Sequence, residues 1–184
     1  LISMGEGDAF LAKFDSNGEL EWAKTLGGSA ADSSRGLALD GAGNVYWSGS
    51  FLGSATIDDT TLSNAGNADA FVVKYGSNGV LEWARSFGGT LSDHAASVSL
   101  DHRDQPYFAG LFQATASFDA ITLSSSGEQD LFLAKLDPDS GQAVWVKRAG
   151  GTGSDQLRGL AIDADGSVLL TGYFEETATF DEHA

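Results

Sequence analysis

The sequence predicts an all-β fold made of three tandem copies of one unit of about 61 residues. Landmarks recur at fixed spacing: Asp8–Phe10 returns as Asp69–Phe71 and as Asp130–Phe132, at offsets of 61 residues. Short apolar segments alternate with turns rich in Gly and Asn, and no segment has the periodicity of an amphipathic helix. The predicted repeats are approximately residues 1–61, 62–122 and 123–184 of a single domain, 1–184.

Each unit contains three predicted hairpins. In the first unit, Ala9–Phe14 and Glu19–Leu26 flank a turn whose Asn and Gly tolerate positive φ. Gly36–Asp40 and Val45–Phe51 form the second hairpin, and Ser54–Ser63 predicts a third that is smaller and more exposed. All regular elements are therefore expected to be strands.

Composition limits the function classes. The 184 residues include no cysteine, which excludes disulfides and thiolate–metal sites. Ten basic and 26 acidic residues give a net charge of −16, which argues against nucleic acid and anionic membrane surfaces as partners. No apolar run approaches the ~18 residues of a membrane span, so membrane insertion is not predicted. The acidity is expected to keep an extracellular or periplasmic protein soluble, with a cation-binding or salt-adapted surface as the alternative.

The segment Asp40–Gly49 resembles the bacterial β-propeller repeat family abbreviated SBBP. The resemblance covers essentially the whole chain, but the middle copy departs from the pattern at Asp104–Tyr107, where Pro106 removes a backbone donor. The residues that match the family's pattern are Gly27, Gly28, Asp32, Leu37–Asp40, Gly43–Tyr46, Gly49, Asp69–Phe71 and Lys74.

The resemblance implies a β-propeller with four-stranded blades. From the innermost strand outwards, the strands of one blade would be Gly36–Asp40, Val45–Phe51, Ala70–Tyr75 and Val80–Phe87, with Ser54–Ser63 as an inserted small hairpin. A β-trefoil is the alternative three-part β fold, although its units are usually shorter.

This blade assignment also predicts how the protein assembles. Leu1–Leu26 would supply only an outer pair of strands, and Gly153–Phe180 only an inner pair. These halves are complementary, so one hypothesis is a head-to-tail homodimer in which two chains complete a six-bladed ring. The competing interpretation is that the three units are a piece of a longer propeller.

The candidate ligand site lies where three loops lead into the innermost strands. Asp32, Asp93 and Asp155 recur there, each after a Gly doublet, and the resemblance places them on one face near the propeller axis. Their carboxylates either fix the loops by accepting backbone N–H groups or face a ligand. In the second case, the site would also contain Arg35, His94 and Arg158, whose repeat positions vary as on a recognition surface.

Two acidic turns are the candidate metal sites. Asp163–Ser167 and Asp137–Gly141 resemble the first half of an oxygen-rich calcium loop, so the candidate ligands are Asp137, Asp139, Asp163 and Asp165. Phe174 stands where an EF-hand needs glutamate, and ordinary hairpin chemistry also explains these turns. Calcium is therefore an option, and no other cofactor is predicted.

No motif predicts catalysis. The chain has no Gly-x-Ser-x-Gly elbow, phosphate-binding loop or His-Glu-x-x-His motif. The repeated Trp22, Trp83 and Trp145 are expected to pack between blades, although a sugar-binding role is the alternative. With the resemblance, the predicted function is a non-catalytic module for protein or glycan binding or for scaffolding, in a secreted protein or on the bacterial cell surface. The alternatives are a calcium-dependent, lectin-like protein and a non-catalytic part of a larger enzyme.

Overall fold

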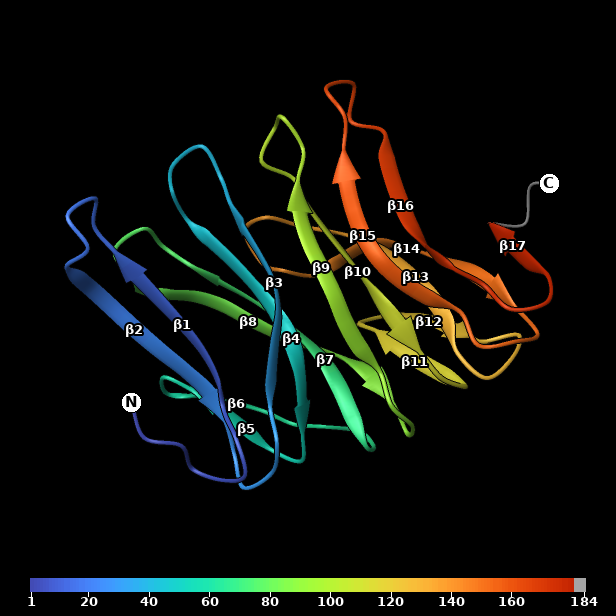
Figure 1. Ribbon diagram of the computed structural model, residues 1–184, viewed down its shortest axis with the longest axis horizontal. Helices are drawn as coiled ribbons and strands as arrows, with labels where there is room; N and C mark the ends of the chain where they lie inside the picture. The colour runs from blue at the N-terminus through green and yellow to red at the C-terminus, as the bar shows by residue number, and fades with distance from the viewer. Residues whose placement is uncertain (181–184) are drawn as a thin grey trace.

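In the computed structural model, which describes residues 1–180, every regular element is a β-strand (Figure 1). The all-β prediction is therefore confirmed. These residues contain no helix that is long and apolar enough to cross a membrane. The strands are β1 (Ala9–Phe14), β2 (Leu20–Gly27), β3 (Ser33–Leu39), β4 (Val45–Leu52), β5 (Ala55–Ile57), β6 (Thr60–Leu62), β7 (Ala68–Tyr75), β8 (Leu81–Gly89), β9 (His94–Leu100), β10 (Pro106–Phe112), β11 (Thr115–Phe118), β12 (Ile121–Ser124), β13 (Asp130–Leu136), β14 (Ala143–Gly151), β15 (Gln156–Ile162), β16 (Val168–Tyr173) and β17 (Ala178–Phe180).

The strands form four antiparallel sheets that lie side by side in a row (Figure 1). The two central sheets have the orders β12-β11-β8-β7-β4-β3 and β17-β14-β13-β10-β9, and the sheets β1-β2-β5-β6 and β15-β16 lie at the two ends. The strand order expected for one unit is present as β3-β4-β7-β8 and again as β9-β10-β13-β14. We call β3, β9 and β15 the inner strands.

The sheets pack face to face through apolar side chains. Strand β7 is buried along its whole length because both of its faces are covered. Phe71 and Val73 point into the core shared with the β1-β2 sheet, whereas Ala70 and Val72 point into the core shared with the β9-β10-β13-β14 strands. This explains why the sequence of β7 is apolar without alternation.

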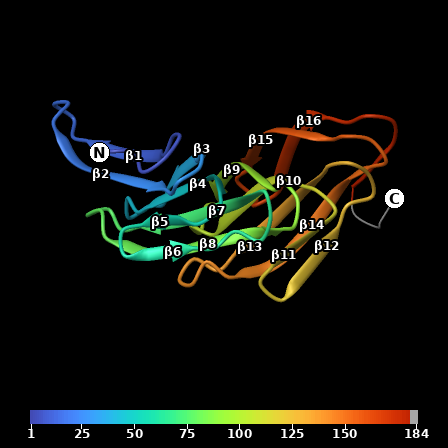
Figure 2. The ribbon, with the colours of Figure 1, turned by 90° about the horizontal axis from the view of Figure 1, so that it is seen from below.

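The small hairpin lies in a different place from the one expected. It follows the second strand of its own unit in the sequence, but it pairs with the outer strand of the preceding sheet: β5 pairs with β2, β11 with β8, and β17 with β14. The central sheets therefore have six and five strands rather than four. Figure 2 shows the hairpins along the lower side of the molecule, opposite the inner strands.

The Gly doublets make this pairing possible. A Cβ added at Gly89 would collide with the carbonyl group of Thr115, at the start of the hairpin that pairs with β8. The docked hairpin then carries Phe118 into the core, where its ring centroid lies 5.4 Å from Phe87 and 4.8 Å from Phe132. The same close approach occurs at Gly28 and Gly151.

Candidate functional site

The three repeated aspartates are buried and engaged by backbone groups. Asp93 accepts the N–H of Gly89 at 2.7 Å through Oδ2 and the N–H of Gln113 at 3.1 Å through Oδ1. Each carboxylate thus ties the outer strand of the preceding sheet to the end of the second strand of its own sheet. The equivalent contacts are Asp32 with Gly28 and Leu52, and Asp155 with Gly151 and Glu175.

Burial raises the pKa of two of these carboxylates, Asp93 and Asp32. Desolvation raises the pKa of Asp93 to about 7, and the nearby carboxylate of Asp69 adds to the shift, although two backbone hydrogen bonds oppose it. Burial also raises the pKa of Asp32 above its ordinary value. The buried positions of Asp93 and Asp32 explain their raised pKa values, so no ligand is needed to account for them.

The two arginines of the predicted site lie at β-bulges of the inner strands. The pairing register of β3 with β4 shifts around Arg35, and that of β15 with β16 shifts around Arg158. The middle unit has the same shift around Ala96. A bulge leaves one residue unpaired and turns its side chain away from the regular pleat, which is a common way to present a functional group.

A cavity of about 500 Å³ lies among the inner strands, and Arg35, His94 and Arg158 all line it. Gln129 and Gln156 also line this cavity, and Gln156 Nε2 donates to Gln129 Oε1 at 2.8 Å. We call it the inner cavity. The structure thus brings together the three basic residues singled out from the sequence, but it places the aspartates in the supporting loops.

The inner cavity carries uncompensated positive charge in an acidic protein. Within residues 1–180, Arg35 and Arg158 make no ion pair, and Arg158 lies 5.7 Å from the centre of the Tyr173 ring. Burial, together with the charge of Arg35, lowers the pKa of His94, so its imidazole is neutral at pH 7. Four other basic residues do have acidic partners: Lys13 with Glu21, Lys24 with Asp58, Lys74 with Glu82, and Arg148 with Asp130.

Sequence reasoning missed the two glutamines of the inner cavity. Gln156 occupies the same repeat position as His94, 62 residues later, so the recurrence itself could have identified it. Gln129 gives no such signal, because glycine and alanine stand at its position in the other units. Both side chains add hydrogen-bonding groups beside the arginines. The arrangement is chemically suited to an anionic group.

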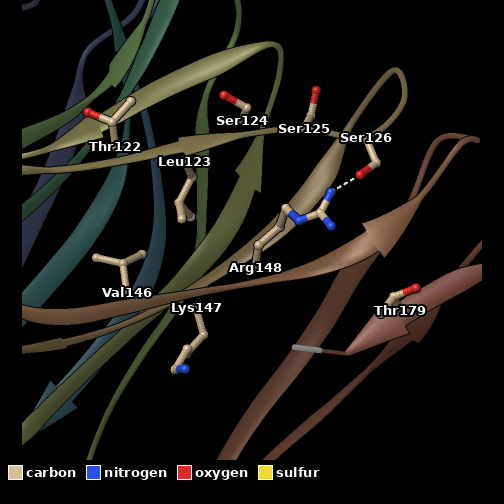
Figure 3. Close-up of a pocket in the computed structure, with 9 residues that line it drawn as sticks. All are labelled: Thr122, Leu123, Ser124, Ser125, Ser126, Val146, Lys147, Arg148 and Thr179. Carbon is tan, nitrogen blue, oxygen red and sulfur yellow. Dashed lines mark hydrogen bonds between the residues drawn. The ribbon is translucent and has the colours of Figure 1, made fainter. Parts of the chain in front are cut away.

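A second cavity of about 500 Å³ lies between β12 and β14 (Figure 3). Its lining includes the hydroxyl groups of Thr122, Ser124 and Ser126, and Figure 3 shows Arg148 directed toward Ser126. Arg148 is also 3.0 Å from the buried carboxylate of Asp130, which neutralises its charge. This cavity therefore offers less attraction to an anion than the inner cavity.

The acidic turns hold themselves together. Asp163 Oδ1 accepts the N–H groups of Asp165 at 2.9 Å and Ser167 at 2.8 Å, and Asp137 Oδ1 accepts those of Asp139 and Ser140. Across residues 1–180, no group of three or more acidic or histidine side chains is gathered so that it could hold a metal ion.

The repeated tryptophans of the first two units lie between adjacent sheets. Trp83 donates its indole N–H to the carbonyl group of Pro138 at 3.1 Å and lies against Gly141 in the same turn. Trp22 lies in the same way against Gly79. Both rings therefore serve packing.

These features define an all-β repeat protein of stacked antiparallel sheets. No family model matches the chain. The WD repeat-containing protein L264 of Acanthamoeba polyphaga mimivirus, which is itself uncharacterized, is 25% identical over 202 residues, covering 92% of this chain and 14% of that protein. The regulatory protein FlaEY of Caulobacter vibrioides is 28% identical over 175 residues, covering 91% of this chain and 18% of that protein. The chain thus spans less than a fifth of the length of these curated relatives.

Proposed function

We propose that the chain is a non-catalytic β-propeller module that binds another protein, and that the inner cavity takes an acidic group of that partner. The observation that carries this proposal is a pair of arginines at matching bulges, neither of which has an ion pair within residues 1–180, in a chain of net charge −16. A guanidinium that faces a cavity offers a strong, directional site for a carboxylate.

Three observations support the propeller as the architecture. The sheets stand side by side, the strand order β3-β4-β7-β8 recurs in the next sheet, and one relative is named for WD repeats. They favour a propeller over a trefoil. The resemblance to the SBBP family and a location outside the bacterial cell belong to the same proposal. Its non-catalytic character is supported by the lack of catalytic motifs in the sequence.

Binding of the chain to an array of acidic peptides and acidic glycans tests the proposed function. We expect acidic peptides to bind, and Arg35→Gln and Arg158→Gln each to weaken binding by about tenfold or more, because each removes a charge-assisted hydrogen bond. Arg103→Gln is the matched control, since it removes the same charge from an exposed turn outside the inner cavity. Equal binding by all variants would show that the inner cavity is not the site. Binding of glycans alone would refute a protein partner.

A further inference from the structure

Two buried carboxyl groups meet at the junction between the central sheets. Asp69, near the start of β7, is 2% exposed, and Asp93, in the loop that leads into β9, is 1% exposed. A Cβ added at Gly88 would lie 2.5 Å from Asp69 Oδ1 and 3.0 Å from Asp93 Oδ2. Both oxygens therefore border one small space, which is open because position 88 has no side chain.

One of the four carboxyl oxygens of this pair has no hydrogen-bond partner. Asp93 accepts backbone N–H groups through both of its oxygens, and Asp69 Oδ2 accepts the N–H of Ala65 at 2.9 Å. Asp69 Oδ1 is buried and receives no hydrogen bond. An ionised carboxylate can only accept hydrogen bonds, whereas a protonated carboxyl group can donate one. A proton in the shared space would therefore satisfy Asp69 Oδ1.

No positive side chain compensates this pair. In the part of the chain that the structure describes, neither Asp69 nor Asp93 forms an ion pair. Desolvation and then the charge of Asp69 raise the pKa of Asp93 to about 7, and burial also raises the pKa of Asp69. The adjacent His94 adds no charge at pH 7, because burial lowers its pKa. When two carboxyl groups share a desolvated site, one proton is retained to a higher pH.

The equivalent pair of the third unit has a cation beside it. Asp130 Oδ1 and Asp155 Oδ2 lie 2.8 and 2.5 Å from the Cβ position of Gly150. Arg148 is 3.0 Å from Asp130 Oδ2, so its guanidinium group offsets one of the two negative charges. In the second unit this repeat position is occupied by Ser86, which has no charge. The second junction therefore lacks the compensation that the third has.

The equivalent residues of the first unit are also relieved. Asp8 is half-buried rather than buried, and its Oδ1 accepts a hydrogen bond from the hydroxyl group of Ser3 at 3.2 Å. Among the three junctions within residues 1–180, that of Asp69 with Asp93 is thus the one in which neither a cation nor a hydroxyl group meets the pair.

We propose that Asp69 and Asp93 share one proton, held between Asp69 Oδ1 and Asp93 Oδ2, and that this proton holds β7 against the loop that leads into β9. When the proton passes to the solvent, two carboxylates face one buried space, and the junction of the central sheets is weakened. The loop is followed by His94, so the shared proton lies near the rim of the inner cavity. The proposal does not depend on what the inner cavity binds.

Asp69→Asn tests the shared proton, because an asparagine amide can donate to Asp93 Oδ2 as a protonated carboxyl group does. The pair has a higher pKa in the folded state than in the unfolded state, so its stabilisation is present below about pH 4 and is lost as the pH rises through about 7. In urea unfolding, the ratio of folded to unfolded wild type should fall by about tenfold per pH unit between about pH 5 and about pH 7, relative to Asp69→Asn.

Asp130→Asn is the matched control, since it makes the same change at the same repeat position beside Arg148. This variant should keep the pH dependence of the wild type, whatever its stability at one pH. Parallel pH profiles of the wild type and Asp69→Asn would overturn the proposal.

Carbon-13 NMR of the carboxyl groups separates a shared proton from a metal ion in the same space. The signals of Asp69 and Asp93 should move together in one titration near pH 7, because a coupled pair titrates as a unit, and calcium chloride should move neither signal. Two carboxyl groups that are both ionised at about pH 5, or a pair that responds to calcium and not to pH, would overturn the proposal.

Arg148→Gln in the Asp69→Asn background tests the role of charge. It leaves Asp130 and Asp155 without their guanidinium group, so the urea midpoint should now fall between about pH 5 and about pH 8. Arg103→Gln in the same background removes the same charge from an exposed turn and should leave the pH profile unchanged. Identical profiles of the two double variants would contradict the charge argument and with it the proposal.

Discussion

The buried aspartates show how a single side chain joins separate strands of this fold. Asp93 receives N–H groups from the end of one sheet and from the end of a strand in the next. The contact holds the loop that leads into β9 at the rim of the inner cavity. Because the carboxylate is desolvated there, its pKa rises to about 7.

Asp93→Asn should remove one component of the pH dependence of stability. The pKa of Asp93 is higher in the folded state than in the unfolded state, so the folded state binds more protons. The stabilisation that Asp93 contributes is therefore fully present below about pH 4 and is lost as the pH rises through about 7. Urea unfolding from about pH 4 to about pH 8 measures this. The free energy of unfolding of the wild type should fall across this interval relative to that of the variant. Parallel pH profiles would show that Asp93 is ionised in the folded protein.

At the residue scale, recurrence in the sequence identified the polar positions but not their roles. Asp32, Arg35 and His94 could all be selected because they stand beside landmarks of the repeat. Whether a side chain is buried or faces a cavity depends on one-residue register shifts, such as the bulge at Arg35. Such shifts arise from pairing with another strand, and a local pattern does not specify them.

At the element scale, the small hairpin is the main difference between expectation and structure. Its existence could be predicted from the turn residues of Ser54–Ser63. The strand with which the hairpin pairs could not be predicted, because β5 and β2 share only two residue pairs, Leu26 with Ile57 and Gly27 with Thr56. The signal was present in the Gly doublets, whose lack of side chains lets the hairpin backbone approach.

Phe118→Ala should show how much the docked hairpin stabilises the fold. The Phe118 ring is buried between Phe87 and Phe132, so its loss should lower the free energy of unfolding by about 3–5 kcal/mol. Urea unfolding of the wild type and the variant measures this difference. Ser117→Ala, on the exposed face of the same strand, should change stability by less than about 0.5 kcal/mol. If Phe118→Ala cost no more than Ser117→Ala, the hairpin would not be part of the core.

At the scale of the whole molecule, the fold is a row of antiparallel sheets (Figure 1). The period of about 61 residues was sufficient to predict that one strand order recurs, as β3-β4-β7-β8 and β9-β10-β13-β14 do. It did not predict burial, since Phe10 is 64% exposed although its counterparts Phe71 and Phe132 are buried. The inner cavity also depends on this scale, because three strands far apart in the sequence line it.

Calorimetric titration of an acidic peptide into the wild type and into the double variant Arg35→Gln/Arg158→Gln tests the central claim most directly, namely that the inner cavity holds an acidic group of a partner. The wild type should bind the peptide, and the double variant should bind it much more weakly, because both guanidinium groups that attract the carboxylate are removed. Arg103→Gln should bind like the wild type. Equal affinities of the wild type and the double variant would contradict the account.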